Sequence, residues 1–210
     1  MKNILDIYEE YKIPAMLQMH QLRVAALALC VSKNYREKLD EELIIKGCLL
    51  HDMGNIVKSD LNIFPELVLP EGLEYWQKIK NEFIKKYGEI DHLATLMILK
   101  EININEKFFD FTKSLVEYML ENIVNPQIEL VIAKYADIRV GPHGILSIKD
   151  RMEDFRRRYK GKFSDIYVDN TISVFTEAER NIFTKCNIKP EDITDESINV
   201  YIEELKNVKV

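Results

Sequence analysis

A histidine and an aspartate stand side by side where an apolar stretch of the chain ends. Leu49-Leu50 leads directly into His51-Asp52, and Met53-Gly54 follows. A neutral imidazole nitrogen beside a carboxylate oxygen suits a divalent metal ion of intermediate hardness, and the glycine lets the chain turn away. We interpret the pair as the first part of a metal site.

Two further residues extend this candidate site. His20 lies in the middle of an apolar helical stretch, and Asp137 lies among apolar neighbours in residues 131–138. A carboxylate in such surroundings needs a cation or strong hydrogen bonds to offset its desolvation. Two imidazoles and two carboxylates would form a mixed nitrogen and oxygen site, suited to Mn, Fe, Co, Ni, Zn or Mg. Such an ion generates hydroxide near neutral pH and stabilises charge on a phosphoryl group.

Each of these residues also has a plainer structural explanation. A single His-Asp pair arises often by chance. His20 could be a hydrogen-bonded core histidine, and Asp137 could be a helix-end carboxylate paired with Lys134 or Arg139. The order and context of the whole set favour the metal site.

The composition is typical of a soluble globular protein built from helices. Of the 210 residues, 47% are hydrophobic and 30% are charged, and only 7 Gly and 6 Pro are present, which favours helices over sheets. The net charge of −6 argues against general nucleic-acid binding. We expect no signal peptide and no membrane-spanning segment. The three cysteines lie far apart without CxxC spacing, which indicates reduced thiols in a cytoplasmic protein.

Helical periodicity runs through most of the chain, without a convincing strand-period segment. We predict helices over residues 3–11, 15–35, 40–52, 73–87, 91–101, 106–122, 127–139, 148–159, 167–185 and 194–206. These helices predict an all-α bundle over residues 1–145 with a C-terminal helical extension, residues 146–210, packed on it. The extension could cap its own bundle or pair with a second copy, which would make a homo-oligomer.

Residues 53–72 form the longest stretch with weak periodicity. They include Pro65, Pro70 and the apolar side chains of Ile63, Phe64 and Leu67. An irregular segment of this length, directly after candidate metal ligands, favours a cover or a substrate-binding element over a simple connection.

The ordered set of candidate ligands resembles the HD-domain metal-dependent phosphohydrolase superfamily. The likeness rests on His20, on His51-Asp52 followed by Met53-Gly54, and on Asp137 after Ala133-Lys134-Tyr135-Ala136. It covers roughly residues 15–145. The resemblance implies an all-helical core that holds one or two divalent metal ions, with Asp52 able to bridge two. The implied ligands are His20, His51, Asp52 and Asp137.

The same resemblance implies a reaction. Metal-bound water would attack a phosphate ester or anhydride, usually of a nucleotide or a similar small phosphorylated molecule. Subgroups with a second metal carry additional histidines, and here His92 is available, either as a second-metal ligand or as an ordinary residue at a helix start. The Gly-Tyr-Pro element of the cyclic-dinucleotide branch is absent, and the chain cannot hold the separate synthetase domain of the stringent-response enzymes. A stand-alone hydrolase that acts on the substrate of those stringent-response enzymes remains an open alternative.

Phosphate binding requires cations near the metal. Arg23 lies one turn after His20 and could face the substrate or pair with a surface glutamate. Lys58 follows Asp52 by six residues and could reach a phosphate or lie in solvent.

A basic segment, residues 149–162, holds seven lysines and arginines against three acidic residues. Such a segment is usually a solvated helix face. Because Arg151 begins a helix soon after the Asp137 helix ends, we expect it, with Arg139, to contact the substrate phosphate. His143, in a Gly-Pro-His-Gly turn, is expected at the surface.

Two functions from different classes fit these features. The first is a metal-dependent phosphohydrolase in which Asp52, Arg23 and Lys58 act in catalysis. The second is a non-catalytic module of the same fold that senses a ligand or binds a partner. The complete set of four expected ligands favours the enzyme.

Overall fold

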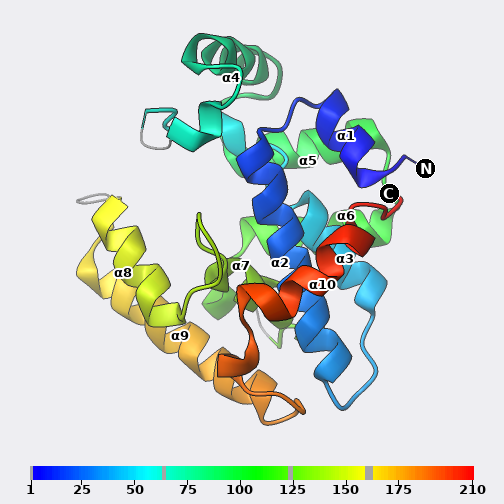
Figure 1. Cartoon of the computed structure of the whole chain (residues 1–210), viewed down its shortest axis with the longest axis vertical. Coiled ribbons are helices and arrows are strands. Elements are labelled where there is room, and N and C mark those ends of the chain that lie inside the picture. Colours follow the sequence, from blue (N-terminus) through cyan, green and yellow to red (C-terminus); the bar gives the residue numbers. More distant parts are fainter. Residues whose placement is uncertain (1, 63–64, 123–124, 159–162) are drawn as a thin grey trace.

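The structure, a computed structural model, describes residues 2–62, 65–122, 125–158 and 163–210. Within these ranges the regular elements are all helices (Figure 1). The α-helices are α1 (Ile4–Glu10), α2 (Ala15–Asn34), α3 (Glu41–Leu50), α4 (Leu73–Tyr87), α5 (Asp91–Ile102), α6 (Glu106–Glu117), α7 (Ile128–Arg139), α8 (Ile148–Arg158), α9 (Asp165–Phe183) and α10 (Asp195–Leu205). The predicted all-α class is confirmed, and all the predicted helices are present. Ile63 and Phe64, and residues 159–162 of the basic segment, lie outside the described residues.

Helix α2 is the central element of the bundle. It packs against α3, α7 and α10, and every residue from Val24 to Ser32 is buried (Figure 1). A helix that is apolar on all sides is stable only when neighbours cover all of it. Among the described helices, α2 alone has the length and hydropathy that a membrane-spanning helix needs. Since 61% of this stretch is buried inside the protein, α2 has the surroundings of a core helix.

The three helices that carry the candidate ligands, α2, α3 and α7, pack against one another. Helix α3 begins at Asp40, whose side chain accepts a hydrogen bond from the backbone N–H of Leu43 at 3.1 Å, as an N-cap residue does. Gly47 lets α6 approach α3 closely, because a Cβ at this position would lie 2.5 Å from ring atoms of Phe111. This packing holds the end of α3, where His51 and Asp52 lie, at a fixed place in the core.

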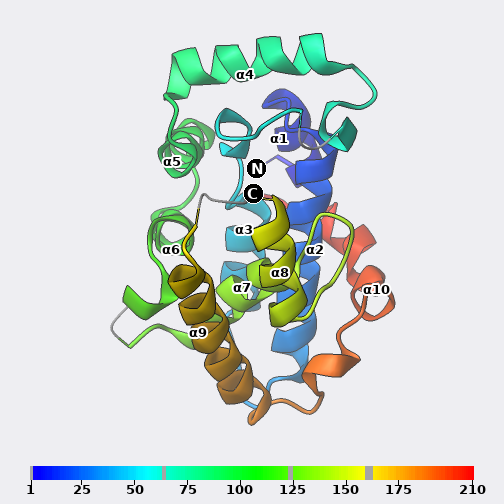
Figure 2. The ribbon, with the colours of Figure 1, turned by 90° about the vertical axis from the view of Figure 1, so that its left-hand side faces the viewer.

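The segment between α3 and α4 contains two short 3-10 helices, η1 (Asn55–Val57) and η2 (Pro65–Val68). Two further 3-10 helices, η3 (Leu120–Asn122) and η4 (Pro190–Asp192), follow α6 and α9. Helix η1 packs against α4 and α5, and η2 contacts α2 and α4. Leu61, after η1, and Leu67, in η2, are buried, so apolar packing holds these two parts of the chain between α3 and α4 in place. Figure 2 shows α4 lying across one end of the bundle beyond it.

The last three helices lie on two sides of the core. Helices α8 and α9 pack against each other and against α7, whereas α10 packs against α2 (Figures 1 and 2). The two chain ends pair, because the N–H of Lys2 donates to the carbonyl of Val210 at 3.1 Å and the reverse bond measures 2.9 Å.

Candidate metal centre

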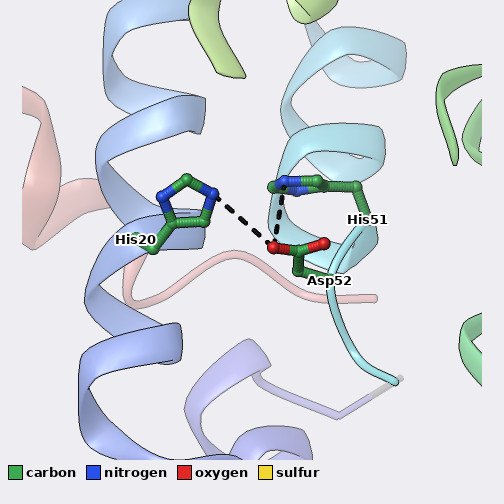
Figure 3. A group of neighbouring side chains, drawn as sticks. All are labelled: His20, His51 and Asp52. Carbon is green, nitrogen blue, oxygen red and sulfur yellow. Dashed lines mark ion pairs between the residues drawn. The ribbon is translucent and has the colours of Figure 1, made fainter. Parts of the chain in front are cut away.

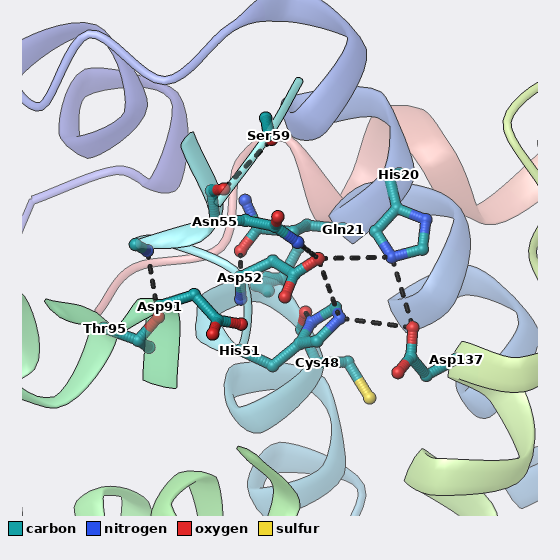
Figure 4. Close-up of polar contacts among 12 residues, drawn as sticks. His20, Gln21, Cys48, His51, Asp52, Asn55, Ser59, Asp91, Thr95 and Asp137 are labelled. Carbon is teal, nitrogen blue, oxygen red and sulfur yellow. Dashed lines mark hydrogen bonds and ion pairs between the residues drawn. The ribbon is translucent and has the colours of Figure 1, made fainter. Parts of the chain in front are cut away.

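Four side chains from three helices meet at one place. The ligand atoms of His20, His51 and Asp52 all lie within 4.8 Å of one another (Figure 3). Asp137 Oδ1 lies 3.2 Å from His20 Nε2 and 3.4 Å from His51 Nε2 (Figure 4). The structure therefore brings together all four residues that the sequence suggested as ligands.

The orientation of the His51 ring suits a metal ligand. Its Nδ1 lies 2.7 Å from the backbone carbonyl oxygen of Cys48, which can only accept a hydrogen bond, so Nδ1 carries the proton. In the neutral ring, Nε2 then presents a lone pair toward Asp52 and Asp137. This nitrogen is buried and has no hydrogen-bond partner among the described residues. A backbone contact that fixes the tautomer in this way is a common support for a metal-binding histidine.

The charges at the centre favour a cation. Burial lowers the pKa of His51, but the carboxylates of Asp52 and Asp137 raise it by more, to about 9. Burial raises the pKa of Asp137, but the imidazoles of His51 and His20 hold it well below its usual range. A divalent ion would replace the proton and offset both carboxylates, so the donor set fits such an ion.

Two polar side chains that the sequence analysis did not single out orient Asp52. Its Oδ2 accepts a hydrogen bond from Asn55 Nδ2 at 2.6 Å, and its backbone N–H donates to Gln21 Oε1 at 3.2 Å (Figure 4). Gln21 is fully buried beside His20. A glutamine within an apolar helix was a signal available in the sequence. Asn55, in an irregular segment, gave no such signal.

Gly54 is required at its position for a reason other than the expected one. Its φ of −95° is accessible to any residue, so the chain needs no glycine to turn here. Instead, a Cβ would lie 2.5 Å from both the carbonyl oxygen of Asp91 and the backbone nitrogen of Thr95. The N–H of Gly54 also donates to Thr95 Oγ1 at 2.9 Å. The glycine therefore allows the chain after Asp52 to lie directly against α5.

The cluster of candidate ligands borders two hollows. The small hollow has a volume of about 140 Å³, and Ser59 and Leu67 from the segment after the His-Asp pair line it. The large hollow has a volume of about 400 Å³ and extends between α6, α7, α8 and α9. His20, Asp52, Asn55 and Arg151 line both. The segment thus contributes to the wall of the site, as a substrate-binding element would.

Two of the expected phosphate-binding cations lie at these hollows. Arg151 lines both and is held by Asp154, whose Oδ2 lies 3.4 Å from its Nη1. Lys58 lines the large hollow, and its Nζ lies 2.5 Å from Asp91 Oδ2. Burial lowers the pKa of Lys58, but Asp52 and Asp91 raise it by more, so the side chain is a cation.

The structure corrects the expectation for Arg139. Its side chain is 6% exposed and lies 3.1 Å from Glu179 Oε2. It also donates to the hydroxyl of Tyr135 and to the carbonyl of Leu146. Arg139 is therefore part of a buried contact between α7 and α9, and it is not among the described residues that line either hollow.

Arg23 is also placed differently from the expectation. It lines a separate depression between α2 and α10, together with Asp195 and Glu203. Three residues along a helix rotate a side chain by about 60° from its starting direction, and here α10 packs on that side. The residues of α2 that line the small hollow with His20 lie before it, at Met16 and Leu17. Helical side chains lean toward the start of the helix, so we expect the His20 side chain to lie nearer the turn that holds Met16 and Leu17 than the turn that holds Arg23.

The two remaining histidines are not among the described residues that form the candidate ligand cluster. His92 Nδ1 lies 4.0 Å from Asp91 Oδ1 and its side chain is 39% exposed. It is not one of the described residues that line the hollows or form the ligand cluster. His143 is exposed in the turn after α7, as expected.

Comparison with known proteins agrees with this geometry. The sequence pattern of the HD domain family matches residues 18–139, more than half of the chain, and this range holds all four clustered residues. Members of this family are generally metal-dependent hydrolases, and HD domains bind divalent metal ions. Searches of curated proteins and of solved structures found no significant match. On its matched sequence and its all-helical fold, the chain belongs to the HD domain family.

Proposed function

We propose that the protein is a metal-dependent phosphohydrolase that cleaves a phosphate ester or anhydride of a nucleotide or a similar small phosphorylated molecule. The observation that carries this proposal is the His20, His51, Asp52 and Asp137 cluster at the mouth of a hollow lined by cations. A divalent ion bound by these residues would lower the pKa of a bound water molecule and would stabilise charge on a phosphoryl group.

The chain's own residues would position the substrate. Arg151 presents a planar guanidinium that can bind two phosphate oxygens at once, and Asp154 restricts its orientation. Lys58 adds a positive charge close to Asp52, held there by Asp91. Asn55 donates to Asp52 Oδ2 and so keeps that carboxylate turned toward the two imidazoles.

We further propose that the protein acts in the cytoplasm. Cys30, Cys48 and Cys186 are all buried and free. Unpaired thiols are usual where the compartment is reducing. The proposed partner of the site is a small molecule.

Phosphate release from a panel of nucleotides and small phosphate esters tests the proposal. Each substrate is assayed with Mn, Co, Ni, Mg and Fe, using the wild-type protein, His51→Ala and Asp52→Ala, with the exposed His143→Ala as the matched control. We expect release by the wild type and His143→Ala and a loss of at least 100-fold in the other two. Unchanged release in His51→Ala and Asp52→Ala would contradict it. Tight metal binding without release from any substrate would favour a ligand-sensing module.

A further inference from the structure

The large hollow is walled in part by helices that lie outside the region shared with the HD domain family. The family match ends at residue 139, whereas α8 and α9 begin at Ile148 and Asp165. Both helices nevertheless line the same hollow as His20 and Asp52. Figure 2 shows α8 and α9 lying together along one side of the bundle, beside α7. This wall belongs to the chain's own extension and is suited to set which substrates fit.

Each of the two helices presents a regular stripe to the hollow. On α8, Arg151 and Phe155 both line it and are four residues apart, which places them on the same face one turn apart, about 6 Å along the axis. On α9, Tyr167, Thr171 and Phe175 line it at the same four-residue spacing. The wall therefore offers a cation next to aromatic side chains.

The aromatic part of this wall is packed. The rings of Phe155 and Phe163 are 4.7 Å apart, and those of Phe163 and Tyr167 are stacked at 5.2 Å. Phe163 thus joins the two rings, although it is not among the described residues that line the hollow. Leu115 and Leu120, both buried, contribute apolar surface elsewhere in the lining. Rings fixed by neighbours lose little freedom when a ligand binds against them.

We propose that Phe155 and Tyr167 bind a flat aromatic group of the substrate while Arg151 and the metal centre hold its phosphate. The preferred substrates are then organic phosphates with an aromatic ring, and sugar phosphates with the same phosphate end bind less well. Only the part of this inference that concerns the phosphate group rests on the proposed function. A hollow of about 400 Å³ is within the usual range for small-molecule sites, and ring stacking is favourable for every aromatic base.

Binding to the metal-free protein tests this wall without turnover. Calorimetry in the presence of a chelator compares adenosine 5′-monophosphate with ribose 5-phosphate, which share a phosphate and a ribose. We expect the nucleotide to bind about tenfold more tightly, and Phe155→Leu or Tyr167→Leu to remove most of that preference while ribose 5-phosphate binding stays within about twofold. Leucine keeps the site apolar, and a helical circular dichroism spectrum checks the fold.

The matched control is Phe163→Leu, the same change in a ring that touches both residues but does not line the hollow. It removes the support of the two rings but neither of the rings that line the hollow, so it should reduce the preference for the nucleotide less than Phe155→Leu or Tyr167→Leu does. Equal binding of the two probes by the wild type would overturn the proposal, and so would an equal loss in Phe163→Leu. If the protein binds the nucleotide selectively but releases no phosphate with any metal, the proposed function is wrong and the proposed aromatic binding site is supported.

Discussion

Replacing Gly54 by alanine tests whether the close contact with α5 supports the metal centre. The new Cβ would lie 2.5 Å from the Asp91 carbonyl oxygen and the Thr95 backbone nitrogen, and 2.7 Å from Ala94 Cβ. Two of these three atoms are backbone atoms of a packed helix, so they cannot move aside as a flexible side chain could. Such overpacking costs about 1–3 kcal/mol, whereas the lower entropy of the unfolded chain returns about 0.4–1 kcal/mol. The expected net loss of stability is roughly 1–2 kcal/mol.

Thermal unfolding and metal titration measure the two consequences. For a chain of this length, the loss corresponds to a Tm lower by about 2–8 °C. Because Asp52 lies two residues before the displaced backbone, we also expect metal affinity to fall by about 10–100-fold, as it does when supporting contacts are lost. Glu66→Ala, an exposed change in the same segment, should alter stability by no more than about 0.5 kcal/mol. An unchanged Tm and unchanged metal affinity in Gly54→Ala would refute the reasoning.

Two other predictions concern the helices around the site. Arg139→Met leaves the partly exposed Glu179 carboxylate with the Tyr135 hydroxyl as its remaining donor and should cost about 1–3 kcal/mol in urea unfolding. Metal affinity equal to that of the wild type would show that Arg139 is structural, and a loss of affinity would show that it is not. Burial raises the pKa of Asp154, but Arg158 and the neighbouring arginines lower it below 3.8. Its ion pairs therefore contribute stability that is present above pH 3.8 and is lost as the pH falls through the lower folded-state pKa. Asp154→Asn should lower stability at pH 7 and weaken the acid dependence below about pH 4; an acid limb identical to that of the wild type would contradict this.

The helices could be predicted because they are local features, and the four candidate ligands could be singled out by their type and their surroundings in the sequence. Helical periodicity, the Asp40 cap and the Gly88 end are readable within a few residues. The His-Asp pair and the two distant ligands share a context that burial imposes, namely polar groups in apolar surroundings.

The rest depended on tertiary packing. Whether a residue one turn from His20 faces the hollow is decided by α10, which covers the Arg23 side of α2. Arg139 belongs to a contact with Glu179, forty residues away in the chain. The hollow itself is made by helices that approach from separate parts of the sequence, so its aromatic wall could not be foreseen from spacing alone.

The most direct test of the central claim is a metal titration across every histidine of the chain, of which there are four. Manganese binding is measured by calorimetry for the wild type and for His20→Ala, His51→Ala, His92→Ala and His143→Ala. The structure predicts that the first two variants lose at least 100-fold in affinity, while His92→Ala and His143→Ala bind as the wild type does. Wild-type affinity in His51→Ala, or a loss confined to His92→Ala, would contradict the metal centre described above.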